Sequence, residues 1–496
     1  MRAWYHFPML FLRLDGDGPL QRQTYRALRA ALLDGRLAAR SRLPATRALA
    51  RELGVSRNTV LGAYEQLVAE GFAAARVGSG TYVSEAIPAR AARPRSDGRA
   101  ARPSRAPALS AYGARVAAGG RASWSLPRES LPYDFRYGEP AYADLPLAAW
   151  ARTLGRRARR LSVKRLAYQP PGGAAELREA LADYLARARG VRSSPEQIVV
   201  VQGSQQAIDL VTRLLVDPGD TVVLEEPHYT GFSFCLAALG AKTVCVPVDE
   251  DGLRVEELER VGAAKLACVT PSHQFPAGGV LSLERRLALL AWAERRGASV
   301  LEDDYDGEFR FEGRPLASLQ SLDEGGRVLY MGTASKLLFP ALRIGWLVAP
   351  PGLAESFMDA KAIADTGTAT LEQLAFADFI REGQLERHVR RARLRHAAKR
   401  AALAEALARE LGDRAEVSGA RAGVHVLLRI PELRAREVRA LREACRARGV
   451  GVYPAAPFYA RPPARAELLL GYAALGEAEI REGVRRLRRA LDAVVA

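Results

Sequence analysis

The segment with the clearest capacity for chemistry is 330–346, in which a single lysine lies among apolar and small residues. Thr333 and Ser335 precede Lys336, and Arg343 follows it. A lysine amine in a desolvated pocket has a lowered pKa and can attack an aldehyde. Hydroxyls and a guanidinium are groups that bind a phosphate. The segment therefore favours a lysine in Schiff base with pyridoxal phosphate (PLP) over an ordinary lysine at a strand end.

Other residues of this kind follow strand-like runs, which alternate with helical ones from residue 131 onward. This alternation is typical of a parallel α/β sheet. The runs 198–202, 221–225, 265–270, 299–301 and 327–331 are the predicted strands, and the polar or aromatic residues after them are Ser204, Gln205, Tyr229, Asp303 and Tyr305. Open α/β sheets bind ligands at the carboxyl ends of their strands. Each of these residues could instead have a purely structural role, such as core packing for Tyr229. The acidic residues at 302–306 could bind a metal, but the sequence shows no second set of metal ligands.

The N-terminal region reads as a helix over 19–34 followed by a second helix, a tight turn at Gly54 and a third helix. Ser56 is a natural N-cap for the third helix. An apolar seam at helical spacing leaves the first turn of that helix exposed, with residues Arg57, Asn58 and Thr59. This is where a recognition helix meets base edges and phosphates.

Two strand-like runs, 72–76 and 81–83, then flank a tip that contains Gly78 and Gly80. Such a pattern predicts a β-hairpin. Together with the helices it predicts a DNA-binding module, with a helical protein-interaction module as the alternative.

Composition is compatible with this interpretation. The 496-residue chain is long enough for two or three domains, and 48% hydrophobic residues suffice for buried cores. Its net charge of +17 favours a polyanionic partner such as DNA, although wide use of arginine in a high-GC genome would give the same charge. The four scattered cysteines match no metal spacing and favour a reducing cytosol. We expect no metal and no membrane span, and we assign no function to residues 1–11.

Residues 85–130 are rich in arginine, proline, alanine and glycine and poor in large apolar residues. Such a segment buries too little to fold alone, so we expect a flexible linker. Its charge either adds affinity for phosphates or merely keeps a tether soluble.

The N-terminal order of elements resembles the winged helix-turn-helix of GntR-type transcriptional regulators, and residues 131–496 resemble a fold-type-I PLP-dependent aminotransferase. The pair is similar to the MocR subfamily. The resemblance implies domains at 12–84 and 131–496 with the linker 85–130 between them. It also implies an α/β fold class, with a mixed, mostly parallel sheet in a large domain and a smaller C-terminal α+β subdomain.

The resemblance also implies roles for the site residues. Lys336 would carry the internal aldimine, Asp303 would pair with the pyridine nitrogen, Tyr305 would bond the ring O3′, and Tyr229 would stack on the ring. The phosphate would be held by Ser204, Gln205, Thr333, Ser335 and Arg343. Tyr168 would reach the partner's phosphate in a homodimer. Contacts with double-stranded DNA would come from Arg47, Ser56, Arg57, Asn58, Thr59, Gly78 and Gly80.

Two positions depart from the aminotransferase pattern. Phe275 stands where an asparagine is usual, so His273 or Gln274 would have to supply that contact. Leu469 stands where an arginine would fork onto the substrate carboxylate. We therefore expect a cytoplasmic regulator with little or no transaminase activity, most like the PdxR-type regulators, with PLP as its effector. The alternatives are a working aminotransferase with an accessory domain and a regulator that senses an amino compound through PLP.

Overall fold

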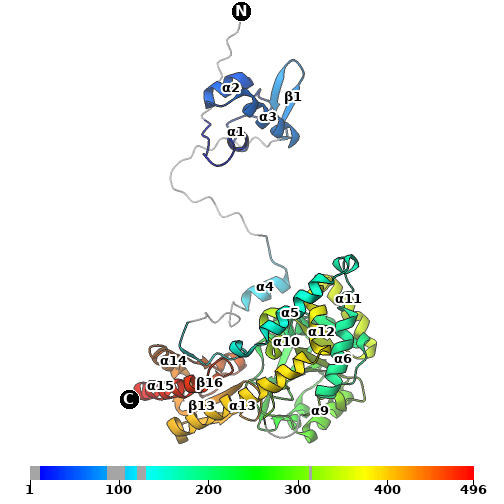
Figure 1. Cartoon of the computed structure of the whole chain (residues 1–496), viewed down its shortest axis with the longest axis vertical. Helices are drawn as coiled ribbons and strands as arrows, with labels where there is room; N and C mark the ends of the chain where they lie inside the picture. Colours follow the sequence, from blue (N-terminus) through cyan, green and yellow to red (C-terminus); the bar gives the residue numbers. More distant parts are fainter. Residues whose placement is uncertain (1–11, 87–106, 120–129, 312–315, 496) are drawn as a thin grey trace, which may run out of the picture. The chain divides into compact units, whose positions relative to one another are not determined.

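The chain divides into two compact units, Met1–Ala108 and Leu109–Ala496, and each is described by itself. This computed structural model describes residues 12–86, 107–119, 130–311 and 316–495 (Figure 1). Most arginines of the predicted linker lie outside these ranges. Among the described residues, no helix has the length and apolarity needed to cross a membrane.

The described part of the N-terminal unit, residues 12–86, contains three helices and a hairpin, as predicted. The helices are α1 (Leu20–Leu33), α2 (Thr46–Leu53) and α3 (Arg57–Ala69), and the antiparallel strands are β1 (Ala73–Arg76) and β2 (Gly80–Val83). Gly54 ends α2 in the left-handed conformation at φ 66°, and the Ser56 hydroxyl caps α3 by accepting from the Thr59 amide at 3.1 Å. Fully buried Leu28, Leu49 and Val60 join the helices in one core.

The second unit is built on an eight-stranded sheet in the order β4-β11-β10-β9-β8-β5-β6-β7. Its strands are β4 (Ile198–Val201), β5 (Thr221–Glu226), β6 (Lys242–Asp249), β7 (Gly252–Leu253), β8 (Leu266–Val269), β9 (Ser299–Asp303), β10 (Val328–Thr333) and β11 (Gly345–Val348). β7 and β11 run antiparallel to their neighbours, and the other pairings in the sheet are parallel. The predicted strands are confirmed to within about two residues, and their carboxyl ends share one edge.

Both faces of this sheet are buried, which explains its nearly continuous apolar strands. Alternate residues of β4 enter different cores: Val200 packs with α5 (Leu147–Arg159), α6 (Ala175–Arg189) and α12 (Thr370–Arg381). Val201 packs with α7 (Ser204–Leu215), α8 (Thr230–Leu239) and α11 (Ala354–Asp365). A further core lies against α9 (Leu283–Arg296).

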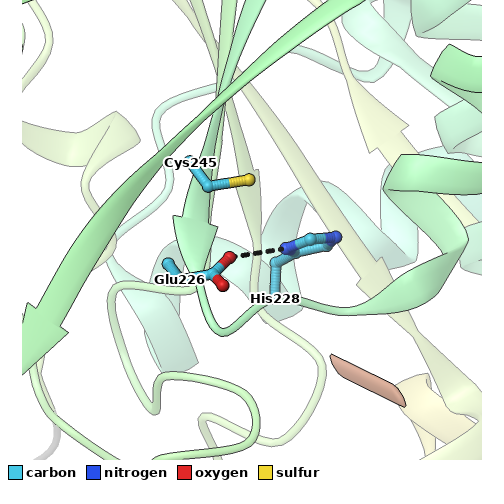
Figure 2. A group of neighbouring side chains, drawn as sticks. All are labelled: Glu226, His228 and Cys245. Carbon is cyan, nitrogen blue, oxygen red and sulfur yellow. Dashed lines mark ion pairs between the residues drawn. The ribbon is translucent and has the colours of Figure 1, made fainter. Parts of the chain in front are cut away.

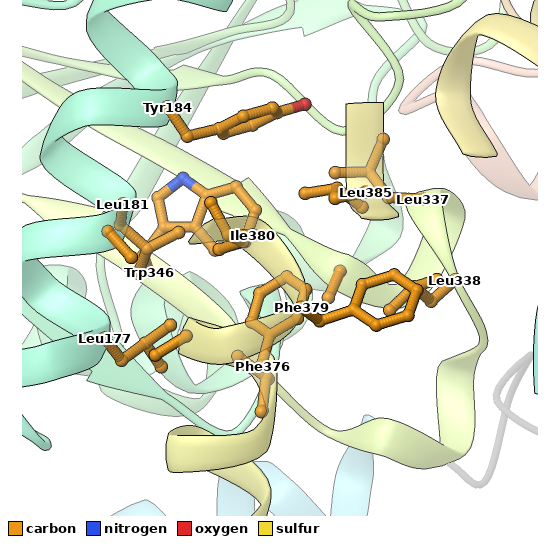
Figure 3. Packing of buried hydrophobic residues seen from close by; sticks show 14 of the residues in the cluster. Leu177, Leu181, Tyr184, Leu337, Leu338, Trp346, Phe376, Phe379, Ile380 and Leu385 are labelled. Carbon is orange, nitrogen blue, oxygen red and sulfur yellow. The ribbon is translucent and has the colours of Figure 1, made fainter. Parts of the chain in front are cut away.

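The first of these cores also holds the lysine segment in place. Figure 3 shows Trp346 of β11 among side chains of α6 and α12, with Leu337 and Leu338 in the same cluster. These two leucines, which end and follow the short helix α10 (Ala334–Leu337), are almost completely buried. Burial of both leucines immediately after Lys336 therefore fixes the backbone of the lysine.

The C-terminal subdomain has a four-stranded antiparallel sheet in the order β12-β13-β16-β15. Its strands are β12 (Glu416–Ser418), β13 (His425–Arg434), β16 (Arg465–Gly471) and β15 (Tyr453–Pro454). The helices α13 (Gln384–Leu411), α14 (Val438–Arg446) and α15 (Glu477–Val495) cover it, and β14 (Val450–Gly451) pairs with β3 (Tyr133–Asp134). This matches the expected smaller α+β part.

One part of the predicted linker is folded. Residues Ala111–Ala118 form helix α4, which packs on α8 within the second unit. The prediction of a structureless segment is therefore wrong here. Local composition could not reveal the helix because its partners come from α7 and α8, more than 90 residues further along the chain.

Candidate functional site

A cavity of about 430 Å³ lies at the carboxyl edge of the large sheet. It gathers eight of the predicted residues from the ends of four strands and the turns that follow: Ser204, Tyr229, Asp303, Tyr305, Thr333, Ser335, Lys336 and Arg343. Residues that are up to about 140 positions apart in the sequence thus meet at one point, as the parallel-sheet argument requires.

Lys336 is the amine of this cavity. Its Nζ donates a hydrogen bond to the Gly138 carbonyl at 2.7 Å. Burial lowers the pKa of Lys336, although the charges of Asp306, Glu139 and Asp303 oppose that shift. Gly138 has φ 79°, and a Cβ there would stand 3.1 Å from the amine. Burial thus shifts this amine toward its neutral, nucleophilic form compared with an exposed lysine.

The other end of the cavity suits an anion. The Thr333 and Ser335 hydroxyls lie 3.0 Å apart, and helix α7 begins at Ser204 with its free amides. Arg343 donates to the Gln202 carbonyl at 2.6 Å. A Cβ on Gly203 would lie 2.7 Å from the Arg343 guanidinium, so only glycine allows this approach.

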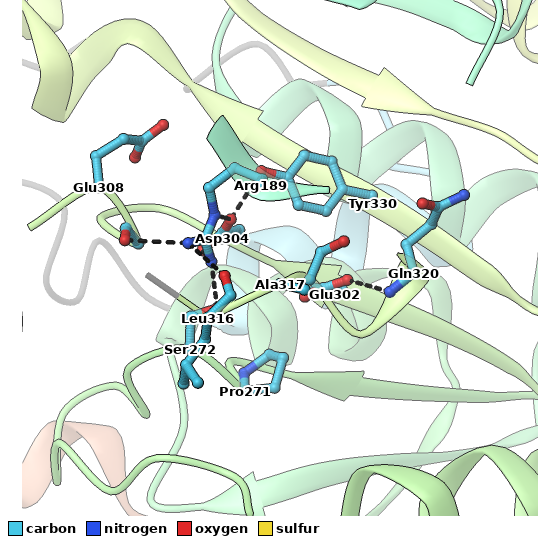
Figure 4. Close-up of polar contacts among 12 residues, drawn as sticks. Arg189, Pro271, Ser272, Glu302, Asp304, Glu308, Leu316, Ala317, Gln320 and Tyr330 are labelled. Carbon is cyan, nitrogen blue, oxygen red and sulfur yellow. Dashed lines mark hydrogen bonds and ion pairs between the residues drawn. The ribbon is translucent and has the colours of Figure 1, made fainter. Parts of the chain in front are cut away.

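Three consecutive acids, Glu302, Asp303 and Asp304, at the end of β9 have different surroundings. Figure 4 shows the two flanking acids, Glu302 and Asp304, among their partners. Glu302 accepts from the Leu319 and Gln320 amides at 2.7 and 2.9 Å. Asp304 pairs with buried Arg189 at 2.6 Å and accepts from the Tyr330 hydroxyl at 2.7 Å. Alternate side chains of a strand point to opposite sides. The flanking acids are thus satisfied on one side, while Asp303 lines the cavity on the other.

Asp303 is only 5% exposed, and its Oδ1 has no hydrogen-bond partner within the part of the chain that the structure describes. Burial, and then the charges of Asp304 and Asp306, raise the pKa of Asp303 well above its ordinary value. A buried polar atom without a partner is costly. A ligand that brings an N–H or a positive charge to Asp303 would remove that cost.

Aromatic side chains complete the walls. The Tyr305 hydroxyl lies 2.9 Å from His273 Nδ1, which in turn lies 3.0 Å from Asp306. Phe275 packs edge-on against Tyr229, with ring centroids 5.9 Å apart. Phe275 itself, rather than the side chain of His273 or Gln274, faces the cavity. His273 bonds Tyr305 and Asp306, and Gln274 donates to Glu225 at 3.1 Å, so neither fills the missing asparagine's place.

Two predicted residues do not line the cavity. The Gln205 side chain donates instead to the Gly231 carbonyl at 3.3 Å and to Cys235 Sγ at 3.2 Å. Only its backbone amide, in the first turn of α7, remains for an anion. Tyr168 is 94% exposed and lies outside the cavity of its own chain, so its role toward a partner stays a prediction.

Sequence reasoning missed the walls contributed by more distant segments. These are Arg136, Tyr137, Gly138 and Glu139 before α5, and Val424, His425 and Phe458 from the C-terminal subdomain. The Gly-Glu-Pro turn at 138–140 could have signalled the first group. The second group carries no local motif. Leu469 is fully buried behind Phe275 and Phe458, so no cation stands at that position.

A separate group, Glu226, His228 and Cys245, has the side-chain types of a metal site (Figure 2). However, His228 Nδ1 lies 3.1 Å from the Glu225 carbonyl, and Glu226 accepts from the Ala460 and Arg461 amides. These groups therefore have structural partners: the loop after β5 is tied to the C-terminal subdomain.

Most of the predicted DNA-contacting residues are exposed in the N-terminal unit. Arg47, Ser56, Arg57, Asn58, Gly78 and Gly80 are exposed. Thr59 is half-buried, and its hydroxyl lies 2.8 Å from that of Ser56, so part of its bonding capacity is used in the helix cap. Arg47 and Arg57 border one hollow beside the turn at Gly54.

The comparisons with known proteins agree with both predicted domains, the winged helix-turn-helix and the aminotransferase-like domain. Residues 20–83 match the gntR family of bacterial regulatory proteins, and residues 134–487 match the class I and II aminotransferases. The chain is 41% identical to the probable rhizopine catabolism regulatory protein MocR of Rhizobium meliloti, over 98% of this chain and 96% of that protein. The chain belongs to the MocR subfamily of GntR regulators. It is a DNA-binding transcriptional regulator with an aminotransferase-like domain.

Two further relatives of this MocR-type chain bear on its cavity. The pyridoxine biosynthesis regulator PdxR of Corynebacterium glutamicum is 34% identical over 71% of this chain and 70% of that protein. The crystal structure of the α-aminoadipate aminotransferase LysN from Thermus thermophilus, in complex with a phosphopyridoxyl-leucine, superposes with a TM-score of 0.68. It is 33% identical and covers 73% of this chain and 92% of LysN. Homologues with the class I and II aminotransferase fold are PLP-dependent.

Replacement of Asp303 by asparagine should stabilise the ligand-free protein. A carboxyl group whose pKa is higher in the folded protein than in the unfolded chain lowers the free energy of unfolding as the pH rises above the unfolded-state pKa of about 3.9. Asp303→Asn removes that loss, so its free energy of unfolding should exceed the parent's at pH 7 and approach it near pH 4.5. Urea unfolding of PLP-stripped protein across this range measures the difference.

Asp304→Asn is the matched control. It breaks the buried ion pair with Arg189 and should lower the free energy of unfolding by about 3–5 kcal/mol. Equal destabilisation by both variants at pH 7 would show that the Asp303 carboxylate is satisfied after all.

Arg57→Ala should weaken binding to the upstream region of the protein's own gene. Loss of a base or phosphate contact costs about 1–3 kcal/mol. A gel-shift titration at fixed salt measures the effect, with Arg439→Ala, on α14 of the second unit, as a control of equal charge. Equal operator affinity for Arg57→Ala and the parent would remove Arg57 from the interface.

Proposed function

We propose that this regulator binds PLP in the cavity and that PLP occupancy controls its affinity for DNA, with genes of vitamin B6 metabolism as targets. The observation that carries the proposal is a desolvated lysine in one cavity with a buried carboxyl group, whose Oδ1 has no hydrogen-bond partner among the described residues. The same cavity has hydroxyls and a guanidinium that suit an anion. PLP carries an aldehyde, a basic ring nitrogen and a phosphate, and it thus complements all three.

The residues present fit that cofactor. Bound PLP supplies an aldehyde for amines and a ring that draws electrons from them. Asp303 would hold a proton on the ring nitrogen, and Tyr305 would donate its hydroxyl hydrogen to the ring oxygen. Ser204, Thr333, Ser335 and Arg343 would bind the phosphate, and Tyr229 would cover the ring. Lys336 would offer its neutral amine from beside the Gly138 carbonyl.

We further propose that transamination is slow or absent. The position expected to bind a substrate carboxylate is Leu469, which is buried in an apolar cluster with Phe275 and Phe458. Arg136 lines the cavity, but its guanidinium lies over the Tyr453 ring at 5.0 Å and near Asp134 at 3.5 Å. A bidentate hydrogen bond from Arg136 to a substrate carboxylate would have to compete with these two partners.

A second candidate is a regulator that responds to an amino compound that reacts with bound PLP. The similarity to MocR, named for rhizopine catabolism, extends over 98% of the chain, whereas that to PdxR extends over 71%. This candidate uses the same cavity and the same lysine. The two differ in whether PLP alone changes DNA binding.

The assembly we propose is a homodimer in the cytoplasm. Tyr168, Leu166 and Val163 are each more than 70% exposed on one segment of the aminotransferase-like domain. Apolar side chains gathered in this way favour contact with another protein surface. In a homodimer, Tyr168 would then reach the partner's phosphate site.

The first test is spectroscopic. Addition of PLP to the purified parent should give a yellow protein with a near-visible absorption band, because Lys336 condenses with the aldehyde. Lys336→Ala should lack the band, while Lys242→Ala, on the exposed surface of β6, should keep it. The same samples are then titrated with operator DNA. A parent that takes up no PLP, or one whose operator affinity PLP leaves unchanged, would refute the corresponding part of the proposal.

The second test compares amino acids with amines that lack the carboxylate, such as phenylalanine and phenethylamine, added to the PLP-loaded protein. A bidentate carboxylate contact contributes roughly 3 kcal/mol, about a hundredfold in affinity. Because Leu469 provides no such contact, we expect the two compounds to bind within about tenfold of one another, followed by slow spectral changes. Rapid turnover of an amino acid with a hundredfold preference over its amine would identify a working aminotransferase with another anchor.

A further inference from the structure

Helix α4 is held at one place on the aminotransferase-like domain. The Arg115 guanidinium donates to the carbonyls of Ala238 and Leu239 at 2.8 and 2.9 Å. These are carbonyls at the end of α8, where helices leave acceptors unsatisfied and favour positive charge. Gly240 ends α8 at φ 89°, and a Cβ there would lie 3.1 Å from Arg115 Cζ. The C-terminus of α8 is therefore open to an arginine.

A second contact comes from the neighbouring helix. Arg213, near the end of α7, lies over the Tyr112 ring at 5.7 Å and donates to its hydroxyl at 3.4 Å. Thus α4 rests on the C-terminal ends of both α7 and α8.

The opposite ends of α7 and α8 form part of the cavity. Ser204 begins α7, Thr230 begins α8 and Tyr229 immediately precedes it, and all three line the cavity. The N-terminal parts of the two helices are linked by the side-chain amide of Gln205 on α7, which donates to the Gly231 carbonyl and to Cys235 Sγ on α8. Buried side chains along both helices, such as Ile208 and Phe232, belong to one core. The two helices therefore form one packed pair, each roughly 15–18 Å long, between the cavity and α4.

Helix α4 has the properties of an element with two states. It has only eight residues, and isolated helices of that length are unstable in water. No residue of α4 is fully buried, so its order depends on few contacts, of which those of Arg115 are the most specific. In the sequence it precedes the cavity domain and follows the segment that leads from the winged helix.

We propose that α4 docks on the ends of α7 and α8 in response to occupancy of the cavity, and that this docking transmits the ligand signal toward the DNA-binding unit. The inference rests on the proposed function, in which PLP fills the cavity. A ligand that fixes the first turns of α7 and α8 fixes the acceptors that Arg115 needs. Coupling of this kind is reciprocal: docking of α4 strengthens ligand binding by the same factor.

The test follows hydrogen exchange in the peptide that covers α4, together with PLP affinity and operator affinity, in the full-length protein. In the parent, PLP should slow exchange in α4 by about fivefold or more. In Arg115→Ala, exchange should be fast with or without PLP, PLP affinity should fall by the same factor, and the effect of PLP on operator affinity should disappear. Arg439→Ala should behave as the parent does.

Two milder variants guard against unspecific damage. Arg115→Lys keeps the charge but lacks the forked donor, and should lose most of the coupling. Tyr112→Ala should reduce the coupling only in part, because the contact of Tyr112 with Arg213 is weaker than the contacts of Arg115 with the α8 carbonyls. If Arg115→Ala keeps the full PLP effect on operator affinity, the docking proposal is overturned while the proposed function stands. If the parent binds PLP with no change in α4 exchange or operator affinity, docking as a transmitter is also overturned, together with PLP as effector.

Discussion

The enclosed carboxyl group of Asp303 is the constraint on which the site depends. An uncompensated charge in a protein interior costs on the order of several kcal/mol, so such a group stays neutral or waits for a partner. The fold supplies donors to its neighbours on either side: two backbone amides for Glu302, and Arg189 with Tyr330 for Asp304. It supplies none to Asp303 Oδ1 among the residues described. The same cavity also keeps Lys336 in a setting that disfavours its charge. A single ligand with a basic nitrogen and an aldehyde, as proposed, would remove both costs.

Much of this site could be predicted because parallel strands are recognisable as short β-branched runs, and their carboxyl ends must meet. Lys336, Asp303 and Ser204 all follow such runs. What could not be predicted depends on tertiary neighbours. The Gln205 side chain faces α8 because Gly231 and Cys235 offer acceptors there. His425 and Phe458 reach the cavity only because the C-terminal subdomain folds back beside the sheet.

Helix α4 illustrates the same limit from the other direction. Its composition is that of a linker, and the residues that stabilise it lie on α7 and α8. Segments of this kind are misjudged by local composition, since a few well-placed hydrogen bonds decide whether they order. An arginine is well suited to this purpose because its fork satisfies two carbonyls at once. Without such contacts the cost of ordering eight residues exceeds what their own helical bonds return.

These features also explain how a cavity built like an enzyme's can serve a regulator. A sensor reports concentration only if its bound state persists long enough for binding and release to determine occupancy. Chemical turnover of the bound ligand would instead make occupancy depend on co-substrate supply. Under the proposed function, the apolar wall at Leu469 would weaken co-substrate binding while the residues proposed to hold the cofactor stay in place. Binding energy that is not used to stabilise a transition state can then shift a conformational equilibrium of the protein. The size of the shift is limited by the difference between the ligand's affinities for the two conformations. An eight-residue helix with few contacts is an element that such a modest difference can order.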